Sequence, residues 1–182
     1  VICISETFLS SSIPNDDTNL ELIGYNMIRC DHPQDVRRGG VLICFKESLP
    51  LKVLNFCQLP ECVVIEILYE NKKCIIASLY RSPSQDHDEF HSFLSNFETL
   101  IDSCFNSSPY VLIILGDFNA KQKLWSPCDN YTPEGNRINA LTSSYGLTQI
   151  ISESTHILPN SSSCIDLIFC NQPNLILNSG VI

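Results

Sequence analysis

The sequence has little positive charge and no apolar run long enough to cross a membrane. Of its 182 residues, 11 are Lys or Arg and 20 are Asp or Glu, which gives a formal net charge of −9. Strong non-specific binding to nucleic acid needs a basic face, so this balance excludes it. A membrane helix needs roughly 18 consecutive apolar residues, and no stretch approaches that length, so we expect no membrane partner. A nucleic-acid enzyme is not excluded, because the carboxylates that hold metal ions are acidic.

Cysteine pairs with metal-binding spacing are also missing. None of the ten cysteines belongs to a Cys-x-x-Cys motif, and Cys57 and Cys62, the most closely spaced pair, are five positions apart. Others, such as Cys44 and Cys74, lie in apolar runs, where a free thiol behaves as a small buried hydrophobe. We therefore expect reduced cysteines, an intracellular chain and no zinc site built from thiolates.

The composition is that of a folded domain. Apolar residues make up 44% of the chain and charged residues 17%, which excludes a disordered or low-complexity protein. A chain of this length is expected to form a single domain over 1–182. It opens on the apolar segment 1–4 and closes on Val181 and Ile182, whereas natural termini are usually polar. We interpret it as a piece of a longer polypeptide.

Short apolar runs of strand length recur along the chain. They are rich in Val, Ile, Leu, Phe and Tyr, and turn residues separate them. The expected strands cover 1–4, 39–45, 62–69, 73–80, 110–115 and 164–170, with weaker candidates at 23–28, 51–56 and 147–151. The Asn- and Ser-rich patches at 10–19, 106–108 and 159–163 are expected to be surface loops.

Two segments have the pattern of helices. An apolar stripe with a period of 3.6 residues runs from Asp86 to Phe105, and acidic residues in its first turn favour the helix dipole. The second segment, 134–145, stops at Gly146, which is a plausible residue to end a helix. Many short strands with only two helices favour an α/β layered sandwich.

Polar residues that could perform chemistry stand at strand ends. The sharpest signal is Gly-Asp-Phe-Asn at 116–119, directly after the run 110–115. Asp117 and Asn119 are two apart, so in extended chain they project to the same side, where they suit orienting a water or binding a metal-held phosphate. An Asx turn at a strand end is the structural alternative. Glu6, after the first strand, is a hard oxygen ligand of the kind that Mg²⁺ prefers.

Two further positions stand out. Tyr80 and Arg81 follow the run 73–80 and offer a phenol and a guanidinium fork for phosphate, or else an edge aromatic and a surface cation. Asp166 lies within the apolar run 164–170. Burying a carboxylate in such a strand costs free energy unless the group is paired or functional. Asp166 is therefore the hardest of these residues to explain without a functional role.

Taken together, these segments resemble the endonuclease/exonuclease/phosphatase superfamily and, more narrowly, the endonuclease domain of LINE-type (non-LTR) retrotransposons. The resemblance covers nearly the whole chain. It rests on Glu-Thr at 6–7, Arg-Gly-Gly-Val at 38–41, Tyr-Arg-Ser-Pro at 80–83, Gly-Asp-Phe-Asn at 116–119, Trp125 and Ser-Cys-Ile-Asp-Leu-Ile-Phe at 163–169. It implies a DNase I-like, four-layer α/β sandwich, in which two mixed β-sheets pack face to face with helices on the outside.

The resemblance implies a metal-dependent phosphodiesterase. It would be a DNA endonuclease that nicks target DNA to prime reverse transcription, with a reverse transcriptase domain in the same polyprotein and the nucleus as its place of action. Mg²⁺ is the implied cofactor, with Mn²⁺ as an alternative ion, and Glu6 would hold it. Asp117 would position or deprotonate the attacking water, and Asn119 would fix the water and the phosphate.

The remaining roles follow from the same resemblance. Tyr80 would hydrogen-bond the scissile phosphate, and Asp166 would complete the polar network that supports the site. Arg81, Ser163 and Thr155 would lie near the DNA backbone.

The family pattern has two parts that these residues do not contain. It begins with an Asn on a strand before the Glu, and it ends with an Asp-His pair on a final strand. The Asp31-His32 pair lies between early strands and so is in the wrong place. We therefore expect the single domain to be truncated at its first strand and at its final Asp-His strand, and the chain as it stands to be inactive.

Other functions remain open. His87 and His91 are four apart on the expected helix, a spacing that binds Zn²⁺, but His32 and His156 lie in distant loops and supply no obvious third ligand. Within the superfamily, a phosphatase or phosphodiesterase acting on lipid or inositol phosphates shares the Gly-Asp-Phe-Asn segment. A catalytically dead relic of the domain is the non-enzymatic alternative.

Overall fold

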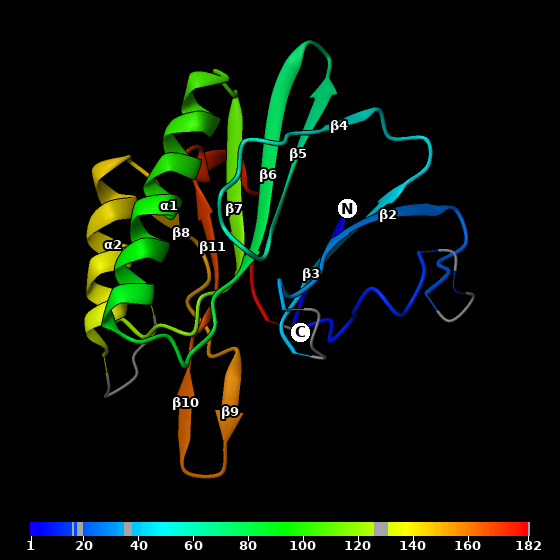
Figure 1. Ribbon diagram of the computed structural model, residues 1–182. Helices are drawn as coiled ribbons and strands as arrows, with labels where there is room; N and C mark the ends of the chain where they lie inside the picture. The colour runs from blue at the N-terminus through cyan, green and yellow to red at the C-terminus, as the bar shows by residue number, and fades with distance from the viewer. Residues whose placement is uncertain (16, 18–19, 35–37, 126–130, 182) are drawn as a thin grey trace.

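In the part of the chain that the structure describes, a larger β-sheet, a smaller β-sheet and two α-helices form the body of the fold (Figure 1), with a two-stranded ribbon and a short 3-10 helix at Pro173–Leu175 in addition. The computed structural model describes residues 1–182 except 16, 18–19, 35–37, 126–130 and 182. The larger sheet has six strands, in the order β4 (Leu51–Val53), β5 (Cys62–Tyr69), β6 (Lys72–Tyr80), β7 (Val111–Asp117), β11 (Asp166–Cys170) and β8 (Thr148–Gln149). The smaller sheet has the order β1 (Ile2–Ser5), β3 (Val41–Lys46) and β2 (Tyr25–Cys30).

The two sheets pack face to face, and both helices cover the outer face of the larger one (Figure 1). The helices are α1 (His87–Asn106) and α2 (Pro133–Ser144). This arrangement confirms the predicted α/β sandwich with outer helices. In the part of the chain that the structure describes, no helix covers the outer face of the smaller sheet. Neither described helix has the length and apolar character that crossing a membrane requires.

The larger sheet is mixed and the smaller one is antiparallel. Strands β6 and β7 are parallel neighbours. Helix α1 connects them and returns the chain to the end of the sheet at which β6 begins. The other pairs of this sheet are antiparallel. In the smaller sheet both β1 and β2 run antiparallel to the central β3.

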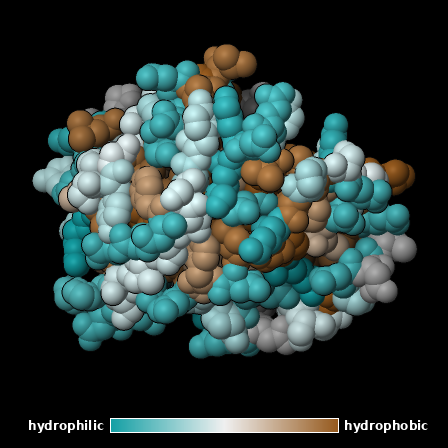
Figure 2. All heavy atoms as spheres, turned by 90° about the horizontal axis from the view of Figure 1, so that it is seen from above, coloured by the Kyte–Doolittle hydropathy of each residue, from teal (hydrophilic) through white to brown (hydrophobic). Residues whose placement is uncertain are grey.

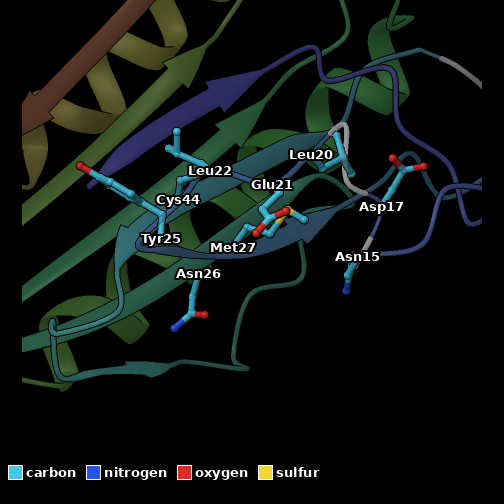
Figure 3. A pocket seen from close by; sticks show the side chains of 9 residues that line it. All are labelled: Asn15, Asp17, Leu20, Glu21, Leu22, Tyr25, Asn26, Met27 and Cys44. Carbon is cyan, nitrogen blue, oxygen red and sulfur yellow. The ribbon is translucent and has the colours of Figure 1, made fainter.

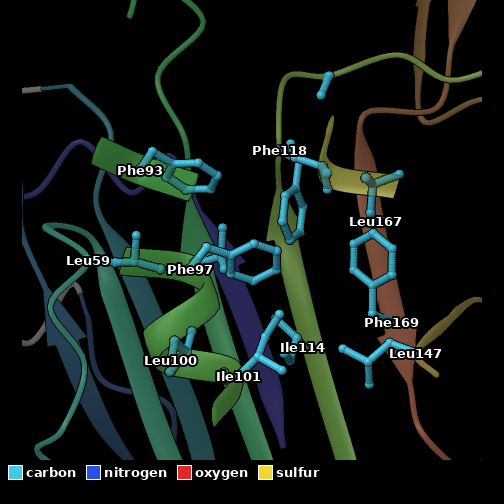
Figure 4. Close-up of a cluster of buried hydrophobic side chains, with 14 of the residues drawn as sticks. Leu59, Phe93, Phe97, Leu100, Ile101, Ile114, Phe118, Leu147, Leu167 and Phe169 are labelled. Atoms are coloured by element: carbon cyan, nitrogen blue, oxygen red, sulfur yellow. The ribbon is translucent and has the colours of Figure 1, made fainter. Parts of the chain in front are cut away.

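Side-chain alternation along the central strands divides the core into two clusters. On β6, Ile75, Ala77 and Leu79 face the helices, whereas Ile76 faces the smaller sheet. The cluster under the helices contains the aromatic series shown in Figure 4, in which Phe118 packs edge-on against Phe97 and Phe169 at 5.6 and 5.3 Å between ring centroids. Such contacts add ~1 kcal/mol each to the free energy of burial. This packing against the helices therefore holds the strands of the larger sheet, and with them their ends, in fixed positions.

Helix α1 begins where the sequence predicts. Asp86 caps it by accepting hydrogen bonds from the backbone amides of Asp88 and Glu89, and the Glu89 side chain returns a bond to the amide of Asp86. This is a capping box, which satisfies amides that the helix itself leaves free. Helix α2 is capped by Thr132, one residue before Pro133, and Gly146 follows its end at φ +68°.

One predicted loop contains a strand. The patch 159–163 was expected to be a loop, but β9 (His156–Leu158) and β10 (Ser161–Ser163) form a two-stranded ribbon. Its side chains are almost all exposed, so no buried apolar alternation marks the strands in the sequence. The ribbon projects beyond the end of the larger sheet where β11 begins (Figure 1).

The opposite end of the molecule shows a mixed surface. Seen from above, hydrophilic side chains cover much of this end, and apolar side chains show between them (Figure 2). The last two residues of β5, Leu68 and Tyr69, are exposed apolar side chains. Scattered exposed apolar residues of this kind are normal on a folded domain and mark no site by themselves.

Candidate active site

Three polar side chains stand in one row across neighbouring strands. Tyr80, the last residue of β6, is in register with Asp117, the last residue of β7. Asp117 is in turn in register with Asp166, the first residue of β11. Residues directly opposite one another share a face of the sheet, and Tyr80 packs on the side of the smaller sheet. Three sequence-predicted residues therefore meet at one end of the sandwich, between the two sheets.

Glu6 reaches this row from the smaller sheet. The Tyr80 hydroxyl donates a hydrogen bond of 3.1 Å to the Glu6 Oε1 atom. Glu6 follows β1 and has a left-handed backbone at φ 55°. The chain after it is held by the amides of Thr7 and Phe8, which donate to the carbonyls of Gly40 and Gly39 at 3.3 and 2.9 Å. A strained backbone conformation that its surroundings enforce is typical of functional sites.

Asn119 orients the Asp117 carboxylate. Its backbone amide donates to Asp117 Oδ1 at 2.8 Å, and its side-chain Nδ2 donates to Asp117 Oδ2 at 3.0 Å. The first bond is the Asx turn that was the structural alternative for this segment. Because Asn119 is also left-handed, at φ 47°, the turn and the polar pair are one arrangement, and both carboxylate oxygens are fixed.

The Asp117 carboxyl group has a strongly raised pKa. The residue is 7% exposed. Burial is the main cause of a shift that raises the pKa of Asp117 to about 7, and the nearby charges of Asp166 and Glu6 raise it further. The bonds from Asn119 act in the opposite direction, because they favour the ionised form. A carboxylate with a pKa near neutrality is suited to accept a proton at physiological pH.

The Tyr80 phenol remains protonated through the neutral range. Burial raises the pKa of Tyr80 well above its ordinary value, and the Glu6 and Asp117 carboxylates add to the effect because a phenolate beside them would be repelled. Tyr80 is therefore a hydrogen-bond donor at the centre of a group of carboxylates.

Arg81 is buried, in contrast to the expected position near a DNA backbone. The residue is 3% exposed. Its guanidinium donates to the carbonyls of Phe118 and Asn119 at 2.5 and 2.6 Å, and to the Ser82 carbonyl and Gln85 Oε1 at 3.1 and 3.2 Å. Burial lowers the pKa of Arg81. A DNA phosphate would reach this guanidinium only if these partners were released.

Thr155 and Ser163 hold the start of β11. Thr155 Oγ1 accepts hydrogen bonds from the backbone amides of Ile165 and Asp166 at 3.2 and 3.1 Å. The Ser163 carbonyl accepts a bond from the Thr155 amide at 3.0 Å, and Ser163 is 2% exposed. These two residues, predicted to lie near DNA, therefore fix the backbone of Asp166, and Thr155 also lines an open hollow.

Hollows lie on both sides of the row. One, of about 490 Å³, is lined by residues that include Tyr80, Glu61 and Arg38. Another, of about 390 Å³, is lined by residues that include Ser5, Thr155 and Asp166. A separate pocket of about 550 Å³ lies on the smaller sheet around Tyr25, Met27 and Cys44 (Figure 3), and no residue of the row lines it. We place the candidate site at the row, because the polar groups converge there.

Glu61 is a buried carboxylate that the sequence interpretation missed. It is 6% exposed, and its Oε1 accepts a hydrogen bond from the Gly40 amide, while its carbonyl accepts one from the Tyr80 amide at 3.0 Å. Burial raises its pKa. Glu61 thus ties the Gly39–Gly40 turn, which holds the segment after Glu6, to the strand end of Tyr80. The signal in the sequence was a lone carboxylate directly before the apolar run 62–69.

The donor set fits a hard divalent cation. No three His, Cys, Asp or Glu side chains of the described residues are grouped so that they alone could hold a metal ion. Mg²⁺ does not require such a cage, since it usually keeps several waters and binds through one or two carboxylates together with substrate phosphate. Glu6 supplies the carboxylate at the mouth of the row, and a cation there would relieve the repulsion that raises the pKa of Asp117.

The histidine pair on α1 does not form a comparable site. His87 and His91 are exposed, and the His87 ring lies 3.4 Å from its neighbour Asp88. No third ligand joins them among the described residues. They are surface residues beside the buried stripe of the helix.

The raised pKa of Asp117 predicts a pH-dependent stability. Between its ordinary value of 3.8 and about 7 the folded protein retains a proton that the unfolded chain has released, so the free energy of unfolding falls as pH rises through this window. At ~1.4 kcal/mol per pKa unit the loss is on the order of a few kcal/mol. Urea unfolding in EDTA at pH 5 and pH 8 measures it. Asp117→Asn should flatten the difference, and added Mg²⁺ should reduce it. Equal pH slopes for parent and variant would contradict the assignment.

Known structures share this architecture. The endonuclease domain of TRAS1, a telomere-specific non-LTR retrotransposon, superposes with a TM-score of 0.66 at 18% identity, over 85% of this chain and 70% of that one. The catalytic domain of Xenopus laevis APE2 gives 0.63 at 18%, over 94% and 74%. The AP endonuclease LMAP from Leishmania major gives 0.69 at 11%, over 92% and 68%. At these identities the likeness shows the fold, which is DNase I-like. No curated protein sequence matches the chain.

Fold and family model together define the class of protein. It is a nuclease or phosphodiesterase domain of the endonuclease/exonuclease/phosphatase superfamily. Residues 74–180, more than half of the sequence, match the family model described as "Endonuclease-reverse transcriptase", and the chain belongs to that family. The matched segment contains Tyr80, Asp117 and Asp166.

Proposed function

We propose that the domain is a Mg²⁺-dependent DNA endonuclease of a non-LTR retrotransposon, which nicks target DNA so that the free 3′-hydroxyl primes reverse transcription. The observation that carries the proposal is the row of Tyr80, Asp117 and Asp166, with Glu6 facing it from the other sheet. The family description supports a reverse transcriptase domain in the same polyprotein as the partner. The proposed substrate is DNA, and the proposed place of action is the nucleus.

Each side chain of the row has a role that its contacts support. Asp117, with its pKa of about 7 and both oxygens oriented by Asn119, is placed to position the attacking water and take its proton. Tyr80 stays protonated, and its hydroxyl, which donates to Glu6 in this structure, would turn to the scissile phosphate once a cation engages Glu6. Asp166 completes the polar network beside Asp117.

Glu6 is the residue that would hold the metal. When bound, Mg²⁺ would neutralise the charge that develops on the phosphate. The carboxylates of the row cannot do this by themselves, because their own charge repels a phosphodiester. With a net charge of −9, the domain should bind DNA weakly without metal, and salt should weaken that binding steeply.

The hollows beside the row favour a polymeric substrate. Space continues past Tyr80 on one side and past Asp166 on the other, so a strand could pass across the row with its phosphate at the centre. A small phosphomonoester would leave one of the two sides empty.

A plasmid assay tests the proposal. A chain that contains these 182 residues together with the Asn strand and the Asp-His strand of the family pattern should relax supercoiled plasmid when Mg²⁺ is present and leave it supercoiled in EDTA, with 3′-hydroxyl and 5′-phosphate ends at the nicks. We expect little or no turnover from the 182 residues alone. Release of phosphate from inositol phosphates without nicking would favour the lipid and inositol phosphatase alternative. No turnover of either substrate by the longer chain would favour a relic domain.

A further inference from the structure

Arg81 makes an unusual set of contacts for a residue next to a candidate catalytic tyrosine. Its Nε and Nη2 atoms, which form one edge of the planar guanidinium, donate to two consecutive carbonyls, those of Phe118 and Asn119. Its Nη1 atom donates to the Ser82 carbonyl and to Gln85 Oε1. All three nitrogens of the guanidinium therefore donate hydrogen bonds to acceptors within the protein.

The main chain of Arg81 also bonds to the segment 117–119. Its amide donates to the Asp117 carbonyl at 2.9 Å. Its carbonyl accepts from Asn119 Nδ2 at 2.9 Å, while the same Nδ2 also donates to Asp117 Oδ2. Backbone and side chain of Arg81 thus contact all three residues of the segment 117–119.

We propose that Arg81 is a positioning residue, whose guanidinium holds the 117–119 turn in the geometry that places Asp117 and Asn119 on the reacting phosphate. The turn is an irregular segment, with Asn119 left-handed at φ 47°, and Arg81 is a residue outside it that contacts each of its three residues. The inference rests on the proposed function for its catalytic part, and it differs from the expectation that Arg81 touches DNA.

Burial explains why an arginine is needed here. A buried cation is costly unless its donors are satisfied. Lysine carries its three N–H donors on one nitrogen and lacks the two parallel N–H groups with which the planar guanidinium edge meets both carbonyls. Phe90 covers one face of the group, with the Arg81 Cζ atom 5.4 Å from its ring centroid.

The same ring supplies a matched control. The Cζ atom of Arg137, on α2, also lies 5.4 Å from the Phe90 centroid. Arg81 and Arg137 therefore share the aromatic contact, but Arg81 is buried and bonds to the 117–119 turn, whereas Arg137 is exposed. Arg81→Lys and Arg137→Lys both keep the charge and lose the planar fork.

Hydrogen exchange of the 182-residue chain tests the positioning directly. In Arg81→Lys the amide of Asn119 should exchange about tenfold faster, because the turn opens more often, while the amide of Ile114 in β7 keeps its protection. Arg137→Lys should leave both rates unchanged. An unchanged Asn119 rate in a folded Arg81→Lys variant would overturn the proposal.

Nicking kinetics separate positioning from DNA contact. In the protein that the plasmid assay shows to be active, Arg81→Lys should lower kcat by ~10²-fold with little change in KM, since the chemical groups are misplaced after binding. A raised KM with unchanged kcat would instead assign Arg81 to DNA binding. If no variant nicks while the exchange result holds, the proposed function fails and the positioning role of Arg81 stands.

A second variant covers the case in which Arg81→Lys does not fold. Gln85→Leu removes one acceptor of the Arg81 Nη1 atom and leaves the guanidinium in place. It should raise the exchange rate of the Asn119 amide by about threefold. No change would show that loosening the guanidinium does not loosen the turn and would contradict the proposal.

Discussion

Asp117→Ala is expected to reduce nicking by ~10²–10⁴-fold, the range observed when a general base is lost. The reason lies in the contacts of the carboxylate. Both oxygens are held by Asn119, and burial raises the pKa of Asp117 to about 7, so one group supplies both the position and the basicity that an attacking water requires. Initial rates of plasmid relaxation in Mg²⁺ measure the effect, in a chain that contains both outer strands of the family pattern.

Two further substitutions separate chemistry from folding. Asp117→Asn keeps the shape of the side chain, but it offers one acceptor to the two Asn119 donors and cannot take a proton, so it should be nearly as inactive as the alanine variant. Asp102→Ala removes a carboxylate of α1 that accepts a hydrogen bond from Tyr145 at 2.7 Å, and it should leave the nicking rate unchanged. An Asp117→Ala variant as active as its parent would show that the chemistry lies elsewhere.

The strands and helices could be predicted because burial leaves a periodic trace in the sequence. Strand β7 has a run of apolar residues and α1 has a stripe, and each was located to within about two residues. The ribbon β9–β10 left no such trace, since its side chains face solvent on both sides. The same rule, that a strand is visible when one face is buried, therefore explains both the successes and the omission.

The convergence of the polar residues was predicted from strand ends, and the structure modifies the argument. Tyr80 and Asp117 do end parallel neighbours. Asp166, expected inside an apolar strand, is instead the first residue of β11, which runs antiparallel to β7. A strand start and a strand end meet at the same edge when the strands are antiparallel, so the three residues still form one row.

The supporting contacts could not be predicted from local sequence. Arg81 reaches a carbonyl 37 positions away, and Glu61 reaches an amide 21 positions away. Neither residue has a periodicity or a motif that indicates its partner. A charged residue beside a strand end can face solvent, or it can be buried and hydrogen-bond to the backbone of a distant segment. Only the packing of those distant segments decides which of the two occurs.

Within the Gly-Asp-Phe-Asn segment, the backbone geometry alone shows why position 116 requires glycine. Its φ is +146°, and a Cβ atom built on it would lie 1.8 Å from the Leu79 carbonyl oxygen. Gly116 is in register with Leu79 on β6. The obstruction is main chain rather than a flexible side chain, so it cannot move without separating β6 from β7, the two strands that carry Tyr80 and Asp117.

Gly116→Ala should therefore lower the free energy of unfolding by on the order of 3 kcal/mol or more, in the range of severe overpacking. Gly146→Ala is the matched control, because Gly146 also has a positive φ, +68°, but no atom within 4 Å of the added Cβ. It should cost only ~1 kcal/mol, the expense of a left-handed backbone. The midpoints of urea unfolding, compared at equal m-values, measure both changes. Equal losses in the two variants would show that backbone conformation, and not the contact with Leu79, requires glycine at position 116.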